Sequence, residues 1–274
     1  ETLFFVANAL LFSAFIYWFY SNSLIDNIDG LNPSQAVVKY LTGYIIELSL
    51  SVDNLFVIAM IFAAFKTPTQ YQHKLLFFGI LGALIFRAIL ISIGLILIHK
   101  IEGMTIIFGL FLLFTALKML KKEAEHTEFE EPKGIMKLFR FSKLIDGGKF
   151  ITKINGKTVF TALFGALLTI EFTDLLFALD SIPAVFAVTT DPFIVYSSNI
   201  FAIMGLRSLY FFLSNMLEKF VYIKYSVFSI LVFVSIKLIT ASWVKIPEWF
   251  SLLFIVVSLL IGIYISTINI KKTE

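Results

Sequence analysis

The chain has 274 residues, of which 59% are hydrophobic and 15% charged, and its formal net charge is +3. Soluble globular domains have about 45–50% apolar and about 25% charged residues, so this composition excludes an ordinary soluble domain. Several apolar runs reach the length of about 20 residues that a helix needs to cross a bilayer. The chain also has no cysteine, which excludes disulfides and thiolate metal sites. We therefore expect an all-α polytopic membrane protein that lies in a lipid bilayer and binds no nucleic acid.

The apolar runs predict about eight transmembrane helices. Residues 1–20 have no positively charged leader and no small-residue cleavage site, so we interpret the first run as a membrane helix and not as a signal peptide. The expected spans are about 2–20, 35–64, 74–98, 103–120, 158–188, 192–215, 224–242 and 248–269.

The loops set the expected topology. Lysine and arginine concentrate in the cytoplasmic loops of membrane proteins. By alternation, one side of the membrane holds Lys66, Lys74 and the many basic residues of 121–157, whereas the other holds only Lys39, Lys100 and Lys245. The first side is therefore predicted to be cytoplasmic, with both chain ends on it and with the 21–32 loop facing outward. The expected location is a bacterial inner membrane.

The long loop at 121–157 contains two distinct segments. Residues 134–145 mix basic and large apolar side chains, which is typical either of an amphipathic segment on the inner leaflet or of a solvated connector. Residues 150–160 place an Asn155-Gly156 turn between alternating side chains, and this pattern predicts a small β-hairpin. Neither segment carries residues that suggest chemistry.

Carboxylates inside the apolar runs are the main indication of function. The run from Thr169 to Ala184 contains Glu171, Asp174 and Asp180. An ionisable group at the bilayer centre costs about 2.5–3.5 kcal/mol on insertion scales, and such groups usually mark a transport pathway. A competing interpretation is that these acids only form ion pairs that hold the helices together.

An internal repeat relates this run to an earlier one. Glu47-x5-Asp53-Asn54 aligns with Asp174-x5-Asp180-Ser181. In each copy a span with an arginine follows, and then a span with a lysine near its end; these residues are Arg87 and Lys118 in the first copy and Arg207 and Lys237 in the second.

Each copy of the repeat has three spans, so the second copy would enter the membrane from the opposite side. This is the inverted-topology plan of many secondary transporters, with the substrate site near the midplane where the repeats meet. The resulting segments are an N-terminal helix and outward loop (1–34), a first repeat (35–120), a cytoplasmic loop (121–157), an inverted second repeat (158–242) and a C-terminal helix (243–274).

Helix geometry predicts how the acids are arranged. Residues seven apart, such as Glu47 and Asn54, share a helix face, whereas Asp53 and Asp180 point about 120° away from that face on a straight helix. Pro183 removes a helix hydrogen bond. We therefore expect local unwinding near Pro183, with Ser49 and Ser51 having a milder effect in the first copy.

Four motifs together resemble the TerC/Alx family of integral membrane proteins. They are Glu47-x-Ser49-x3-Asp53-Asn54, Glu171-x2-Asp174-x2-Phe177-Ala-x-Asp180-Ser-Ile-Pro-Ala, Thr189-Thr-Asp191-Pro-Phe-Ile-Val and Ser198-Asn199-x-Phe201-Ala-Ile-x-Gly205-Leu-Arg207-x2-Tyr210-Phe.

The resemblance implies a manganese exporter, from a family whose name came from tellurium resistance. It implies a metal pathway that consists of Glu47, Asp53, Asn54, Glu171, Asp174 and Asp180.

Other polar residues in the spans are expected to line the pathway or to balance the charge of the acids. We expect Arg87 and Arg207 to be structural counter-ions, with gating as the alternative, and Asp191 to be a helix N-cap or an exit-site residue. Ser49, Ser181 and Asn199 are further pathway candidates.

The ligand chemistry is consistent with a hard cation. All of the candidate ligands are oxygens, which suit Mg²⁺, Ca²⁺ and Mn²⁺, and manganese itself is favoured only by the resemblance. Crowded carboxylates retain protons when no cation is bound, because neighbouring negative charges oppose ionisation. We therefore expect metal efflux by cation/proton antiport, with no organic cofactor and no enzymatic activity. The alternatives are a calcium or other cation exchanger, a scaffold of a metal-stress complex and, less consistent with the symmetric acids, an intramembrane aspartyl protease.

Overall fold

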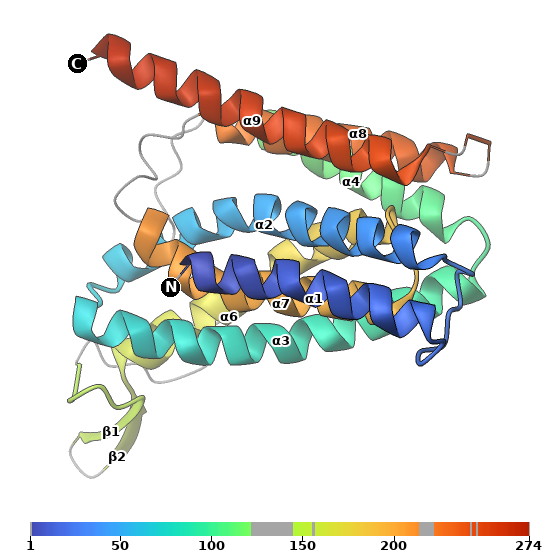
Figure 1. The fold of residues 1–274 in the computed structure, drawn as a ribbon. Coiled ribbons are helices and arrows are strands. Elements are labelled where there is room, and N and C mark those ends of the chain that lie inside the picture. Colours follow the sequence, from blue (N-terminus) through green and yellow to red (C-terminus); the bar gives the residue numbers. More distant parts are fainter. Residues whose placement is uncertain are drawn as a thin grey trace.

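The computed structural model of the protein describes residues 2–121, 145–154, 157–213, 222–241, 243–244 and 246–273 (Figure 1). This part of the chain is helical apart from one hairpin. The helices are α1 (Thr2–Ser21), α2 (Pro33–Ala64), α3 (Thr69–Lys100), α4 (Met104–Lys121), α6 (Ala162–Phe186), α7 (Pro192–Leu213), α8 (Ile223–Thr240) and α9 (Glu248–Thr273). The hairpin consists of the antiparallel strands β1 (Ile151–Ile154) and β2 (Lys157–Phe160).

Every predicted span coincides with one of these helices, so the helical class of the fold is confirmed. Four segments are long and apolar enough to cross a membrane, namely Leu3–Ser21, Thr69–Lys100, Ala162–Phe186 and Trp249–Ile268. The shorter segments Met104–Leu117, Pro192–Leu206 and Tyr225–Thr240 are also apolar. The number of spans and the repeat remain predictions.

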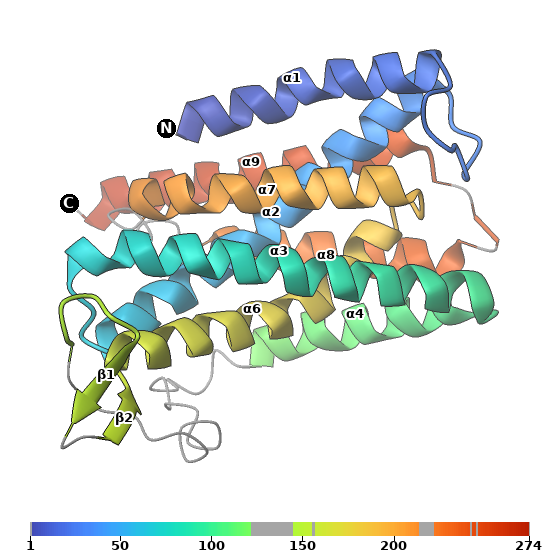
Figure 2. The ribbon, with the colours of Figure 1, turned by 90° about the horizontal axis from the view of Figure 1, so that it is seen from below.

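The helices form a bundle with two distinguishable ends. Figures 1 and 2 show the β1–β2 hairpin at one end, beside the start of α3 and of α6, and the 22–32 loop at the other. We call these the hairpin end and the opposite end. The most extensive packing joins α4 to α8, α2 to α7 and α3 to α6, while α1 lies on α2 and α7, and α9 lies on α8 and α2.

Local sequence explains where α2 begins. Asn32 accepts a hydrogen bond from the Gln35 backbone at 2.8 Å, and the Gln35 side chain accepts one from the Asn32 backbone at 3.0 Å. This reciprocal capping box satisfies two of the free N–H groups at a helix start. Pro33 occupies the first turn, where a missing N–H costs nothing. The first carboxylate-bearing helix is therefore anchored firmly at the opposite end.

The predicted unwinding of the acid-bearing helices is wrong for this structure. The helix α2 runs unbroken over 32 residues, and α6 continues through Pro183 to Phe186. The physical reason is position, since Pro183 lies in the last turn of α6. There it removes only one backbone bond, and Ala187 N–H still donates to its carbonyl at 3.2 Å.

The strands of the predicted hairpin are confirmed, whereas its Asn155-Gly156 turn and the 134–144 segment lie outside the described residues. The hairpin is attached to the start of α3. Lys74 Nζ donates to the Gly148 carbonyl at 2.8 Å and lies 4.7 Å from the centre of the Phe150 ring. The hairpin therefore forms a fixed cap on the ends of α3 and α6.

Candidate cation site

The side chain of Arg87 is the centre of a buried polar cluster. It projects from α3, is 1% exposed, and forms ion pairs with Glu47 of α2 and Asp174 of α6. Its Nη2 lies 3.2 Å from Asp174 Oδ1, its Nε lies 3.4 Å from Asp174 Oδ2, and its Nη1 donates to Glu47 Oε1. One guanidinium therefore joins carboxylates from two helices that are far apart in the sequence.

Two uncharged side chains complete the cluster around Arg87. The Nη1 atom also lies 3.2 Å from Ser181 Oγ and 3.3 Å from Asn199 Oδ1. The amide group of Asn199 is fixed in turn, because its Nδ2 donates to the Val195 carbonyl at 3.1 Å. Both side chains are 2% exposed or less. Helices α2, α3, α6 and α7 therefore all contribute an oxygen or the guanidinium to one interior point.

Unpaired oxygens lie along the neighbouring face of α2. Glu47 Oε2, Ser51 Oγ and Asn54 Oδ1 are buried, and none has a hydrogen-bond partner among the described residues. Residues four and seven apart lie on one face of a helix. Buried polar atoms normally find a partner, so three unpaired oxygens on one stripe indicate a place that a ligand would satisfy. Ser51 was expected from the sequence only to loosen this helix and was not among the pathway candidates.

The remaining predicted site residues lie elsewhere. Asp180 accepts a hydrogen bond at 3.2 Å from Thr115 of α4, on the side of α6 away from Arg87. Ser49 donates to the Ile45 carbonyl at 2.6 Å, within its own helix. The side chains of Asp53 and Arg207 are outside the part of the chain that the structure describes.

Glu171 lies against α3 at Gly82, and its Oε2 is buried without a partner among the described residues. Among the side chains that the structure places, no three carboxylates or imidazoles converge as a ready-made metal site. The structure therefore brings Glu47 and Asp174 together through Arg87, with Ser181 and Asn199, and keeps Asp180 and Glu171 apart from them.

A small cavity reaches the cluster from the hairpin end. Its volume is about 30 Å³, and Asp174 lines it together with apolar side chains such as Ile58, Ala83 and Leu206. The lining residues of α3 precede Arg87, and α3 begins at the hairpin end (Figure 2). A cavity of this size holds about one water molecule. The cavity therefore lies on the hairpin side of the cluster.

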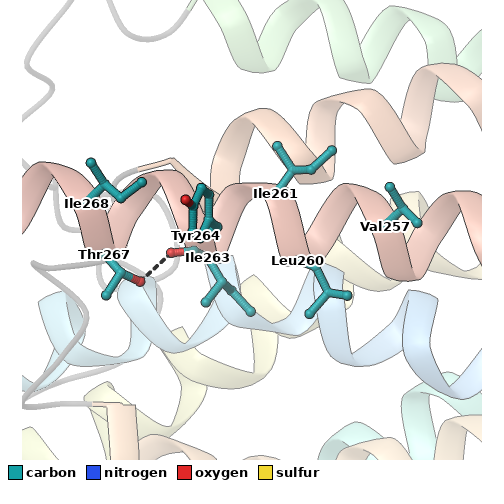
Figure 3. Close-up of a pocket in the computed structure, with 7 residues that line it drawn as sticks. All are labelled: Val257, Leu260, Ile261, Ile263, Tyr264, Thr267 and Ile268. Carbon is teal, nitrogen blue, oxygen red and sulfur yellow. Dashed lines mark hydrogen bonds between the residues drawn. The ribbon is translucent and has the colours of Figure 1, made fainter.

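A much larger groove lies on α9, and unlike the Arg87 cluster it has an almost wholly apolar lining. It has a volume of about 640 Å³, and seven side chains between Val257 and Ile268 line it (Figure 3). The hydroxyl of Thr267 is already used, because it donates to the Ile263 carbonyl at 2.6 Å. The lining is otherwise apolar except for Tyr264. Without convergent polar groups the groove offers no site for a polar substrate.

Hydrogen bonds tie the loops together at the opposite end. Asp29 accepts from Thr189 Oγ1 at 2.8 Å and from Thr190 Oγ1 at 2.9 Å, and Thr190 N–H donates to it at 3.3 Å. Lys39 Nζ lies 3.8 Å from Asp29 Oδ2. The α1–α2 loop is thus joined to the α6–α7 loop.

Asp191 lies next to this tie and caps α7. Its Oδ1 accepts from Phe193 N–H at 3.0 Å and from Ile194 N–H at 3.3 Å, as the N-cap interpretation expects. Its Oδ2 is buried beside the Tyr20 hydroxyl, and neither atom makes a well-formed hydrogen bond among the described residues. Burial raises the pKa of the Asp191 carboxyl, and the Tyr20 hydroxyl and the two backbone N–H groups oppose this rise.

The raised pKa of Asp191 predicts a pH-dependent cost. A carboxyl that binds its proton more tightly in the folded state costs stability once it ionises, so stability falls as the pH rises from about 3.9 through the raised pKa. We expect Asp191→Asn, which keeps a cap acceptor, to have a higher melting temperature than wild type at pH 7 and an equal one below about pH 4. Asp191→Ala should instead lose about 0.5–2 kcal/mol below about pH 4, where the wild-type carboxyl is protonated, and less at pH 7, where it also escapes the ionisation cost. Thermal unfolding in detergent measures both, and equal losses in the two variants at all pH values would contradict the assignment.

Comparison with known proteins decides the family. The integral membrane protein TerC family matches residues 32–274. The chain belongs to the TerC family. A Rickettsia conorii protein called an uncharacterized membrane protein is 42% identical over 271 residues, covering 98% of this chain and 86% of its own. The putative membrane-bound redox modulator Alx of Escherichia coli is 41% identical over 249 residues, covering 90% of this chain and 76% of its own. No solved structure matches.

Within this TerC family chain, sequence reasoning missed one residue beside the site and gave another a different role. Gly82 precedes Arg87 by five positions on α3, and Ser51 lies between Glu47 and Asn54 on α2. Small residues in membrane helices mark close helix approach, so Gly82 carried a usable signal. Ser51 was expected only to loosen α2, because a serine in a helix usually bonds to the carbonyl four residues earlier.

Proposed function

We propose that this TerC family protein is a secondary transporter that exports a divalent cation, with Mn²⁺ as the first candidate. The observation that carries the proposal is the meeting of Glu47 and Asp174 on Arg87 in the protein interior. Buried ionisable residues in membrane helices are costly, and they mark ion pathways. All candidate ligands near this point are oxygens, which suit Mn²⁺, Mg²⁺ and Ca²⁺.

The helix packing supports an inverted repeat. If α2, α3 and α4 correspond to α6, α7 and α8, then the extensive contacts of α2 with α7 and of α3 with α6 are equivalent to one another. The contact of α4 with α8 joins equivalent helices, as do the contacts of α2 with α6 and of α3 with α7. A pseudo-two-fold axis would produce this set of pairs. Glu47 and Asp174 would then be equivalent residues that meet near the axis.

In this proposal the cation replaces the Arg87 guanidinium between the two carboxylates. Two carboxylates match the charge of a divalent cation better than that of a single arginine. Ser181 and Asn199 already contact Arg87, and the unpaired oxygens of Ser51 and Asn54 on α2 are further candidate ligands. Arg87 thus acts as a tethered counter-ion that keeps the acids neutralised while no substrate is bound.

The loop charges and the cavity support a direction of transport. The concentration of lysine and arginine in the loops favours a cytoplasmic hairpin end. The small cavity at Asp174 approaches the cluster from that end. In this proposal a cation would reach the cluster from the cytoplasmic side, and the loop tie would close the opposite end. Protons returning through the carboxylates would drive export.

Manganese transport is tested in inside-out membrane vesicles that contain the protein. We expect Mn²⁺ accumulation that depends on an imposed pH gradient, and protection of a manganese-sensitive strain by the same gene. Empty vesicles are the control. Accumulation that ignores the pH gradient would reject proton antiport while keeping transport. No accumulation and no protection would reject the exporter.

The name of the Escherichia coli relative suggests redox modulation, and a scaffold is a further alternative. This chain has no cysteine, so it offers no thiol for disulfide exchange. A scaffold would keep its partners when the buried carboxylates are neutralised, whereas an exporter would lose transport. Competition by Ca²⁺ or Mg²⁺ for Mn²⁺ binding distinguishes a manganese exporter from a general cation exchanger.

A further inference from the structure

A second carboxylate of α6 lies outside the Arg87 cluster in an unusual position. Glu171 lies three residues before Asp174, so the two side chains share one face of the helix. Asp174 turns to Arg87, whereas the carboxyl group of Glu171 packs against the backbone of α3 at Gly82. Because Glu171 Oε2 is buried and unpaired among the described residues, no strong bond explains why the group lies there.

The absence of a side chain at position 82 is what makes this position possible. A methyl group on Gly82 would lie 2.1 Å from Glu171 Oε1 and 2.2 Å from both Cδ and Oε2. These distances are well inside van der Waals contact, so the carboxyl group and a methyl group exclude one another.

The other glycines of α3 that face α6 serve a different purpose. A methyl group on Gly79 would lie 3.2 Å from Ile170, and one on Gly94 would lie 2.5 Å from the Phe186 ring. These contacts show that α3 and α6 run in the same direction at close approach, as Figure 2 illustrates. The partners at Gly79 and Gly94 are apolar and belong to ordinary helix packing. Gly82 differs because its partner is a carboxyl group.

We propose that Gly82 is a positioning residue that holds the Glu171 carboxyl group in a seat beside the cation site and away from Arg87. The inference rests on the proposed transport function. While Glu171 is seated, Asp174 and Glu47 meet Arg87 without a third carboxylate. Rotation of Glu171 about its side-chain bonds then adds an oxygen ligand during the transport cycle. The seat therefore sets when Glu171 can join the site.

The placement is tested by a double-mutant cycle on thermal unfolding, which needs no transport. Gly82→Ala should lower the melting temperature by several degrees in wild type, because overpacking strains the interior. In a Glu171→Ala background the same change should cost little, since the seat is empty. Gly79→Ala is the matched control on the same helix, and its cost should be equal in both backgrounds. Equal costs of Gly82→Ala in both backgrounds would overturn the inference.

The role in transport is tested by separating binding from turnover. Gly82→Ala should keep Mn²⁺ affinity but slow vesicle transport by about tenfold or more, because a misplaced group can cost up to about 100-fold. Adding Glu171→Asp, which shortens the side chain, should restore part of the rate. A Gly82→Ala variant that transports normally while wild type is active would reject the positioning role alone. If wild type does not transport Mn²⁺ but the thermal unfolding cycle still couples Gly82 to Glu171, the transport function is rejected. The contact between Gly82 and Glu171 is then still supported.

Discussion

Asp174→Asn and Glu47→Gln should each abolish Mn²⁺ export. Each change removes one of the two charges that meet at Arg87, while the side-chain volume stays nearly the same. One carboxylate and neutral oxygens then remain as ligands. They bind a divalent cation too weakly for it to displace the Arg87 guanidinium in the protein interior. The loss of transport is measured as the initial rate in inside-out vesicles, and the loss of affinity as Mn²⁺ binding to the purified protein.

The matched control for these variants is Asp146→Asn. Asp146 lies in the loop before the hairpin, is exposed, and pairs with Lys149 at 3.4 Å. This variant removes the same type of charge far from the cluster, so transport should stay at the wild-type rate. If Asp174→Asn and Glu47→Gln transport like Asp146→Asn, the cation does not pass through the Arg87 cluster.

Arg87→Gln should destabilise the cation-free protein strongly and make it depend on the substrate. Removing one partner of a buried ion pair typically costs about 3–5 kcal/mol, because the remaining charges lose their counter-ion. Here two carboxylates would be left. If Mn²⁺ takes the place of the guanidinium, then Mn²⁺ should restore stability to the variant. A ligand at 100 times its dissociation constant adds about 2.7 kcal/mol.

The measurement is the melting temperature of wild type and Arg87→Gln with and without Mn²⁺. The Mn²⁺-induced increase should be larger in the variant, since the cation no longer competes with Arg87. Arg87→Lys is the control, because it keeps a positive charge but loses the forked geometry that reaches both carboxylates. If Mn²⁺ raises the melting temperature of Arg87→Gln by the same amount as that of wild type, or by less, then the cation does not bind where the Arg87 guanidinium lies.

The sequence predicted the helices well, because length and hydropathy alone set the membrane-spanning candidates. It also predicted the hairpin strands, since alternation and an Asn-Gly turn are local signals. The capping role of Asp191 was accessible for the same reason. The predicted break at Pro183 was wrong, because the effect of a proline depends on how far it lies from the helix end.

The arrangement of the candidate site was only partly accessible from the sequence. Spacing indicated that Asp174 and Ser181 share a face and that Asp180 points elsewhere, and the structure places them so. Spacing along one helix contains no information about which partner faces it. The meeting of Arg87 with Glu47 and Asp174, and the position of Glu171 at Gly82, depend on how α3 packs against α2 and α6.

The hydrogen bonds between the loops at the opposite end have a consequence for how often that end could open. Opening that end would break three hydrogen bonds to Asp29 and separate it from Lys39. Net contributions of about 0.5–1.5 kcal/mol for each bond give a total of about 3 kcal/mol. A conformation at that free energy accounts for less than about 1% of the molecules, which is within the range of minor states that a ligand can select. The cation would therefore find the opposite end almost always shut, and export would wait on rare openings.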